Sequence, residues 1–204
     1  MKNRERYLKS IRRNCNEIAN AIMEKEALIA IERFIAQYEE VCHVGASFFE
    51  ISKNALFNDM IAHAIKVLDK NKNSATFWYI LKTDETRAKT LKIYSEEKLQ
   101  ELHNLTKKLK LVRDKTHFHI DRESVLDSSS VWKDADISGN ELSAGLEYLF
   151  EFLLELRNDV FNEKASRNNY LYKGDDVIRL LELAKENNII KVIEKSAMKE
   201  LAGS

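Results

Sequence analysis

The sequence predicts an all-α fold, a single-domain antiparallel bundle of about five long helices plus short ones. Proline is absent from the 204 residues, and glycine occurs only five times. Because these two residue types end helices and form tight turns, their scarcity permits long helices and disfavours a sheet-rich fold. Apolar residues recur at spacings of three and four, which is the period of a helix and not of a strand.

Each expected helix is placed by its apolar period and by polar residues that can cap it. The expected helical segments are 3–24, 26–42, 47–68, 77–81, 84–121, 142–160 and a last one after Asp175. Ser74 is expected to cap the short fourth segment, and Thr83 or Asp84 the long fifth one. Ser138 and Glu141 have the spacing of a capping box.

The remaining stretches indicate how the chain is organised. Residues 122–138 form the longest stretch without a helical pattern and are expected to be irregular. The sequence shows no internal repeat, no low-complexity tract and no interdomain linker. We therefore expect one domain over residues 1–204.

Composition argues against several classes of function. Basic and acidic residues number 33 each, so contact with nucleic acid or a membrane would need a local patch of charge. Two cysteines, Cys15 and Cys42, are too few for a disulfide framework or a zinc cluster, and we expect neither a metal nor a cofactor. No apolar run approaches the ~20 residues of a membrane span, and the first residues lack a signal-peptide core. We expect a cytoplasmic protein without a membrane partner.

Candidate chemistry is concentrated between Arg113 and Asp121, where the sequence reads RDKTHFHID. Arginine presents a planar, permanently charged fork that matches phosphate. Histidine gains or loses a proton near neutral pH. Cleavage of RNA without a metal needs both properties, because one group must move a proton and another must stabilise the charge of the transition state.

Two histidines, His117 and His119, are candidates for the proton carrier. On a straight helix His117 lies ~40° round from Arg113, whereas His119 lies ~120° round and ~9 Å along the axis. Geometry within one helix therefore favours His117. A site shared between two chains would relax that constraint.

This segment resembles the signature of the HEPN superfamily, in which an arginine and a polar residue are followed, several positions later, by a histidine. The positions on the family's pattern are Arg113, Asp114, Lys115, His119 and Asp121. The family's spacing selects His119 and leaves His117 as an extra histidine at a variable position. Phe118 departs from the pattern, since alanine is more usual there.

The resemblance extends upstream of the motif. Residues 48–59, 67–69 and 74–81 resemble the abortive-infection branch (type U) of the superfamily. The resemblance covers about residues 25–165 and leaves 166–204 as a C-terminal helical extension.

The resemblance implies a HEPN-like homodimer whose two motif helices face each other across a composite cleft. Arg113 would bind the phosphate and its transition state, and His119 would act as general acid and base. Asp114 would orient Arg113 or the partner chain's histidine. The expected accessory residues are His117, Lys115 and Asp121.

Active HEPN members cleave RNA without a metal, and many are toxins or phage-defence proteins partnered with a nucleotidyltransferase antitoxin. The resemblance therefore implies an RNA substrate and, as a partner, an antitoxin of that type. Other members are inactive helical modules. The alternative function is accordingly a non-catalytic HEPN module that acts through dimerisation or by binding a partner or nucleotide, and a third is an unrelated helical adaptor.

The residues before the motif form a basic run that includes Lys107, Lys108 and Lys110. Such a run is usually a solvated helix face, and it is also what binding to an RNA backbone requires. Arg113 has a structural interpretation too, as the ion-pair partner of Asp114 or of another acidic neighbour. The sequence leaves both pairs of interpretations open.

Overall fold

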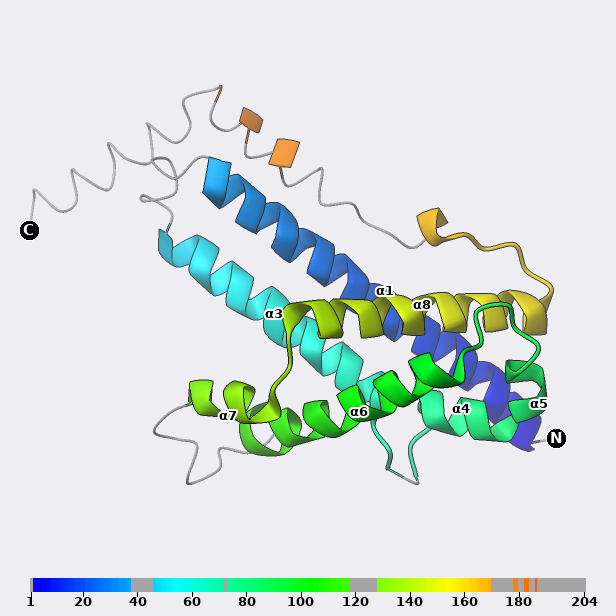
Figure 1. Cartoon of the computed structure of the whole chain (residues 1–204). Helices are drawn as coiled ribbons and strands as arrows, with labels where there is room; N and C mark the ends of the chain where they lie inside the picture. Colours follow the sequence, from blue (N-terminus) through cyan, green and yellow to red (C-terminus); the bar gives the residue numbers. More distant parts are fainter. Residues whose placement is uncertain are drawn as a thin grey trace, which may run out of the picture. The chain divides into compact units, whose positions relative to one another are not determined.

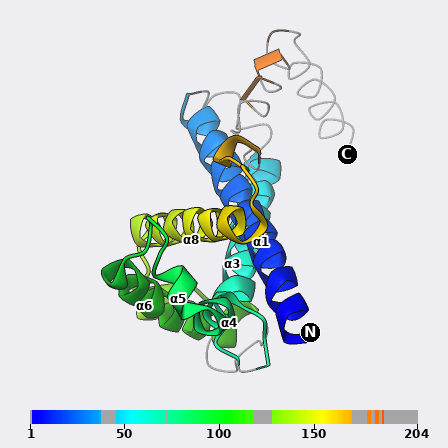
Figure 2. The ribbon, with the colours of Figure 1, turned by 90° about the vertical axis from the view of Figure 1, so that its right-hand side faces the viewer.

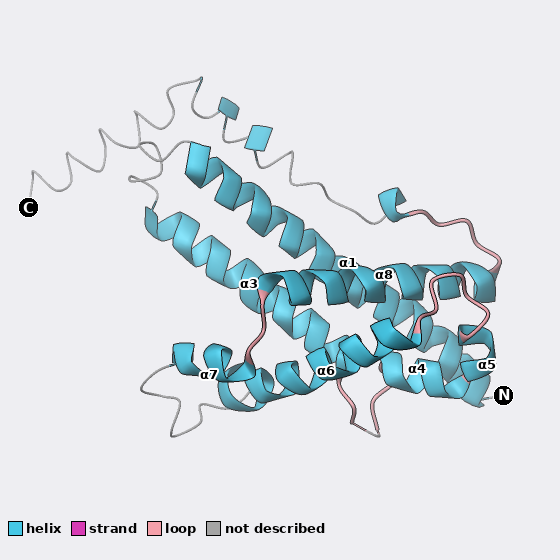
Figure 3. Cartoon of the chain, in the orientation of Figure 1, coloured by secondary structure: helices cyan, strands magenta, loops and turns pink. Residues whose placement is uncertain are grey.

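The computed structural model describes residues 2–37, 46–71, 73–117 and 128–169, and the separate positions 178, 179, 182, 183 and 186. All regular structure in this part of the chain is helical, which confirms the predicted all-α class (Figures 1 and 3). The elements are α1 (Lys2–Gln37), α3 (Ala46–Leu68), α4 (Phe77–Thr83), α5 (Glu85–Ala88), α6 (Glu96–Val112), the π-helical turn η1 (Arg113–His117), α7 (Ser128–Ala135), α8 (Gly139–Phe161) and the 3₁₀ turn η2 (Arg167–Asn169).

Contacts divide the chain into two compact units. The first comprises Met1–Ile22 and Asn58–Leu171, and the second comprises Met23–Phe57 and Tyr172–Ser204. The boundaries fall inside α1 and α3, so each of these helices contributes to both units. That residues 1–204 form one domain stays a prediction. None of the described helices is both long and apolar enough to cross a membrane.

The core of the first unit contains buried side chains from α1, α3, α4, α6 and α8, and α6 and α8 run side by side (Figures 1 and 2). Their buried side chains include Leu102, Leu105, Leu109 and Val112 of α6, and Leu142, Leu146, Leu149, Phe150, Phe152 and Leu153 of α8. Each such side chain stabilises the fold by ~1.5–3 kcal/mol when it leaves water. Gly145 permits the close approach, because a Cβ atom there would overlap Cδ2 of Leu105.

Residues 23–37 of α1 and 46–57 of α3 make up the described helices of the second unit. Ile31, Phe34 and Phe49 form its apolar cluster, with the rings of Phe34 and Phe49 centred 6.0 Å apart. An ion pair of 3.3 Å joins Lys53 to Glu32 across the two helices.

The first helix differs from expectation. We predicted separate helices over 3–24 and 26–42, but α1 continues without interruption from Lys2 to Gln37. The reason is local, because residues 24–27 read Glu-Lys-Glu-Ala and all four are strong helix formers. Residues 38–42 of the second predicted helix lie outside the described part of the chain.

The predicted long helix over 84–121 also begins in the wrong place. Asp84 does cap a helix, but only the four-residue α5. The long helix α6 begins at Glu96, where the hydroxyl of Ser95 accepts a hydrogen bond from the third residue of the helix. Between the two, the backbone N–H groups of residues 92 and 93 donate to the carboxylate of Glu155 at 2.8 and 3.1 Å. This long-range contact stabilises a non-helical connection that local sequence does not predict.

Two further boundaries change and one is confirmed. Ser74 does not cap the short helix, because α4 begins after Thr76, whose side chain makes no capping bond. Residues 128–135, expected to be irregular, form α7. Ser138 caps α8 as predicted, and its Oγ accepts from the backbone N–H of Glu141 at 3.0 Å. The predicted helix after Asp175 lies almost wholly outside the described residues.

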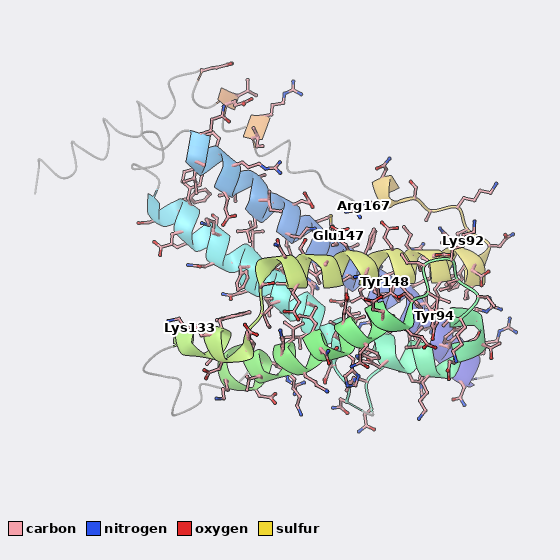
Figure 4. The ribbon with its side chains drawn as sticks, viewed as in Figure 1. Lys92, Tyr94, Lys133, Glu147, Tyr148 and Arg167 are labelled. Carbon is pink, nitrogen blue, oxygen red and sulfur yellow. The ribbon has the colours of Figure 1, made fainter. Side chains whose placement is uncertain are left out.

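The segment after α8 folds back onto that helix. Arg167 forms ion pairs with Glu147 and, at 3.1 Å, with Glu151 of α8 (Figure 4). On the same helix, Tyr148 Oη accepts a hydrogen bond of 3.3 Å from the backbone N–H of Ser95 and so ties the start of α6 to α8.

Candidate functional site

The motif begins where α6 ends. After Val112 the backbone widens into the π-helical turn η1, from Arg113 to His117, so the predicted regular α-helix is interrupted at Arg113. Turns of this kind are rare in proteins, and those that occur are often found at functional sites. The angles of a straight α-helix therefore do not describe how Arg113 and His117 are related. The side chain of His117 and the whole of residues 118–127 lie outside the described structure.

Arg113 lies between two carboxylates. Its Nη1 is 3.0 Å from Oδ1 of Asp69, at the end of α3, and its Nε and Nη2 are both 2.7 Å from Oδ1 of Asp114. Burial lowers the pKa of Arg113, but its hydrogen bond to Asp114 and the charges of both carboxylates outweigh this, and the pKa is raised. The guanidinium is therefore held charged and in a fixed orientation.

Arg113 and Asp114 form one wall of a cleft of about 690 Å³ within the first unit. The other lining residues are Arg13, Asn14 and Glu17 of α1, Ile65, Lys66 and Asp69 of the α3 end, and Asn73, Ser74, Ala75 and Thr76. This volume lies within the ~300–1,000 Å³ typical of small-molecule sites. The three cationic side chains in the lining are balanced by three carboxylates, so the cleft as a whole carries no net charge.

A buried amide fixes the shape of this cleft. Nδ2 of Asn14 donates to the backbone carbonyls of Ser10 and Ala75, both at 2.8 Å. Because Asn14 is buried, these two bonds satisfy donors that would otherwise be costly to remove from water. They tie the connection between α3 and α4 to α1 and so hold one side of the cleft in place.

Glu17 is the most highly connected acid in the cleft. Its carboxylate lies 2.7 Å from Nδ1 of His63, 3.4 Å from Nζ of Lys66 and 3.8 Å from Nε of Arg13. Burial raises the pKa of Glu17, but the hydrogen bond from His63 and the charge of Lys66 outweigh it and the pKa is lowered. Glu17 therefore stays ionised at neutral pH.

The three lysines of the basic run have different surroundings. Lys107 and Lys110 are exposed and line a shallow groove beside Arg113. Lys108 instead donates to the carbonyl of Asp136 at 2.6 Å and pairs with Glu141 at 2.8 Å. It thereby ties α6 to the start of α8. Lys115, in η1, is half-buried.

In the structure Arg113 contacts Asp114, which both the motif and the structural interpretation of Arg113 allow, and it also contacts Asp69, an acid that the motif did not identify. Asp69 lies within a segment that resembles the family, but nothing in its local sequence marks it as a partner of Arg113. His119 and Asp121 lie outside the described residues, so their relation to Arg113 stays a prediction.

Comparison with known proteins gives no relative for this chain. No protein-family model, no curated protein and no solved structure matches it. The HEPN resemblance therefore rests on the motif residues and on the segments upstream of them.

Proposed function

We propose that this protein is a metal-independent endoribonuclease of the HEPN type. The observation that supports this most directly is the position of Arg113. It lines both the 690 Å³ cleft and a second hollow of about 260 Å³ that contains Lys70 and Lys110. An RNA strand lying across both hollows would place a phosphate at the guanidinium of Arg113.

Arg113 retains donors for such a phosphate. A guanidinium carries five N–H groups. The contacts with Asp69 and Asp114 use three of them, one each on Nη1, Nε and Nη2. Among the contacts that the described residues make, one N–H group on each terminal nitrogen has no partner, and each can donate to a phosphate oxygen. Asp114, which contacts Nε, holds the plane of the guanidinium and would act as the positioning residue.

The proposed reaction is transesterification within the RNA. The 2′-hydroxyl oxygen attacks phosphorus, its proton passes to a base, and the bond from phosphorus to the 5′-oxygen breaks as that oxygen takes a proton from an acid. His119 is the proposed proton carrier, with His117, Lys115 and Asp121 as accessory residues. Arg113 would stabilise the charge that develops on the phosphate oxygens.

The proposal includes the partners that the resemblance implies. The protein would act as a homodimer with the two copies of the motif at one site, as a toxin or phage-defence factor controlled by a nucleotidyltransferase-type antitoxin. Lys107 and Lys110 would contact the RNA backbone. Lys108, which pairs with Glu141, would stabilise the packing of α6 against α8.

The non-catalytic HEPN module has an observation in its favour too. Arg113 satisfies two carboxylates at once, which is also what a purely structural arginine does. In that case the 690 Å³ cleft would serve as a nucleotide or partner site. Cleavage assays separate the two functions.

The test is cleavage of a labelled RNA by purified protein in excess EDTA. We expect the wild type to cleave, and His119→Ala and Arg113→Lys to lose ~10²–10⁴-fold in rate. Arg87→Lys is the matched control, because Arg87 also lies between two carboxylates, Asp84 at 3.2 Å and Asp159 at 3.0 Å, away from the cleft. Its activity should equal that of the wild type.

Circular dichroism would establish that each variant is folded before rates are compared. Cleavage that disappears in EDTA and returns with magnesium would contradict the proposed chemistry. No cleavage by a folded, dimeric wild type on any RNA tested would favour the non-catalytic module.

A further inference from the structure

A groove beside Arg113 contains an excess of positive charge. The hollow of about 260 Å³ is lined by Asp69, Lys70, Asn71, Lys110 and Arg113, and a smaller hollow of about 60 Å³ adds Lys107. Lys70 follows the end of α3, whereas Lys107 and Lys110 lie one turn apart on α6. Two distant parts of the sequence therefore bring three lysines to one groove.

Among the described residues, these lysines have no acidic partner. Asp69 is the one carboxylate in the lining of either hollow, and it pairs with Arg113 at 3.0 Å. In the part of the chain that the structure describes, no carboxylate lies within ion-pair distance of Lys70, Lys107 or Lys110. Elsewhere in the same unit, Lys98 pairs with Glu101 at 2.8 Å and Lys89 pairs with Glu85 at 2.6 Å.

Lys70 is held in position by aromatic side chains. Its ammonium donates to the imidazole of His103 and lies 4.4 Å from the centroid of the Trp78 ring. The indole N–H of Trp78 in turn donates to the carbonyl of Leu68 at 2.9 Å. A surface lysine ordinarily keeps several rotamers, so these contacts reduce the entropy that an incoming anion would have to remove.

The crowding of positive charge also changes protonation. Burial lowers the pKa of Lys70, and the charge of Lys107 lowers it further. Burial lowers the pKa of His103 as well, and the charges of Lys70 and Lys107 add to this. Like charges held this close repel each other, and an anion placed among them would relieve the repulsion.

We propose that Lys70, Lys107 and Lys110 bind a second phosphate of a single-stranded RNA, next along the strand from the phosphate at Arg113. This inference rests on the proposed function, because it takes the strand that Arg113 would cleave as the ligand. A hollow of 260 Å³ is below the ~300–1,000 Å³ of sites for whole small molecules, so it suits a phosphate with its water and not a nucleoside. Lys70 is then a binding residue that the sequence motif does not include.

The test is binding of a short 2′-O-methyl oligoribonucleotide, which has no free 2′-hydroxyl and so cannot be cleaved by the proposed reaction. Affinity is measured over a range of salt for the wild type, Lys70→Ala, Lys107→Ala and Lys110→Ala. For single strands, the magnitude of the slope of log K against log salt is ~0.7 for each phosphate that the protein neutralises, so a variant that weakens this one site loses at most ~0.7. We expect the slope to fall in each variant, and Lys70→Arg to restore part of it.

Lys92→Ala is the matched control, since Lys92 is exposed and lies in the connection before α6, away from the groove (Figure 4). Its salt slope should equal that of the wild type. A second readout is the fluorescence of Trp78 in a Trp132→Phe background, which should change on binding in the wild type and not in Lys70→Ala.

The outcomes separate this inference from the proposed function. Normal binding slopes in all three lysine variants, with RNA cleavage intact, would overturn the second phosphate site alone. Lowered slopes in a protein that cleaves nothing would support the site and overturn the nuclease. Equal affinity for a poly-glutamate of matched charge would show that the groove takes acidic peptides, and would overturn its assignment to RNA.

Discussion

The ion pairs of Arg113 are short, but each contributes little to the free energy of folding. Exposed fractions of 24%, 26% and 47% for Arg113, Asp69 and Asp114 place these ion pairs near the surface. Pairs in such surroundings contribute ~0–1 kcal/mol each, because water screens them. A phosphate could therefore replace Asp69 as a partner of Arg113 at little cost in free energy, while Asp114 keeps the fork oriented. The ion pairs and the proposed phosphate site are thus compatible.

The two histidines of the motif can be separated by mutation. We expect His119→Ala to lose ~10²–10⁴-fold in RNA cleavage, as is typical when a positioned acid or base is removed. His117→Ala should keep most of the activity, because the family's spacing selects His119. The measurement is the single-turnover cleavage rate of both variants in EDTA. An inactive His117→Ala together with an active His119→Ala would reverse the assignment.

A pH effect is expected from Glu17, whose side chain is 21% exposed and contacts His63 and Lys66. Its pKa lies below the ordinary 4.5, so the ionised form stabilises the folded state at pH above 4.5. That stabilisation is lost as the pH falls through the lowered pKa. Chemical denaturation at a series of pH values should therefore show a steeper acid-side loss of unfolding free energy in the wild type than in Glu17→Gln.

Glu5→Gln is the control for this measurement. Glu5 also pairs with a lysine, Lys9 at 2.7 Å, but its side chain is 65% exposed, so the pair is screened. Its pH profile should follow the wild type closely. Parallel profiles for the wild type and Glu17→Gln would contradict a stabilising role for the Glu17 cluster.

At the residue scale, contacts between site residues could be predicted from the sequence only where the two residues are adjacent in the chain. Arg113 and Asp114 are adjacent, and their contact was expected. The partnership of Arg113 with Asp69, and that of Lys70 with His103, joins residues more than thirty positions apart. Nothing in either local pattern encodes these contacts, because they arise only when the residues that follow α3 come next to α6 and η1 in the folded unit.

Among the elements, the presence of helices was predictable and several of their ends were not. Ser138 was recognised as a cap because Ser138 and Glu141 have the spacing of a capping box and a strongly apolar helix follows. Ser95 has the same capping role for α6, but the helical pattern on both sides of it concealed the boundary. The carboxylate of Glu155 holds the connection before Ser95 through backbone bonds, and that long-range contact decides where the helix begins.

Capping gives a direct stability prediction. Ser138→Ala should destabilise the fold by ~0.5–2 kcal/mol, because the backbone N–H of Glu141 loses its acceptor. Ser74→Ala makes the same chemical change at a serine that caps no helix, and should alter stability by less than ~0.5 kcal/mol. Urea denaturation of both variants checks this. Equal losses would mean that the cap contributes nothing specific.

The packing of α6 against α8 gives a second prediction about stability. Gly145→Val should destabilise the fold by ~1–3 kcal/mol, because the added atoms overlap Leu105, which is buried. Gly139→Val is the matched control, since no atom lies within 4 Å of a Cβ placed there. Thermal unfolding should lower the Tm of the first variant only. A Gly145→Val protein as stable as the control would show that α6 and α8 can separate without loss.

For the whole molecule, the zero net charge conceals an uneven distribution. Composition indicated no field for nucleic acid, and the 690 Å³ cleft is indeed balanced in charge. The adjoining groove is not, because its single acid pairs with Arg113 and three lysines remain. Net charge therefore describes the average surface, whereas recognition depends on how packing distributes the charges.

The proposed site also requires two copies of the chain, because the family's arrangement draws Arg113 and His119 from both motifs. We expect light scattering to show a homodimer, in line with the commonest symmetry of oligomers. Arg113→Lys and His119→Ala homodimers should both be inactive. A heterodimer with one chain of each kind, purified through two different tags, should regain part of the wild-type cleavage, because its shared site then contains one intact Arg113 and one intact His119 from different chains. A heterodimer of Arg113→Lys with the double variant Arg113→Lys, His119→Ala is the control and should stay inactive. An inactive first heterodimer, or a monomeric wild type, would contradict a site shared between chains.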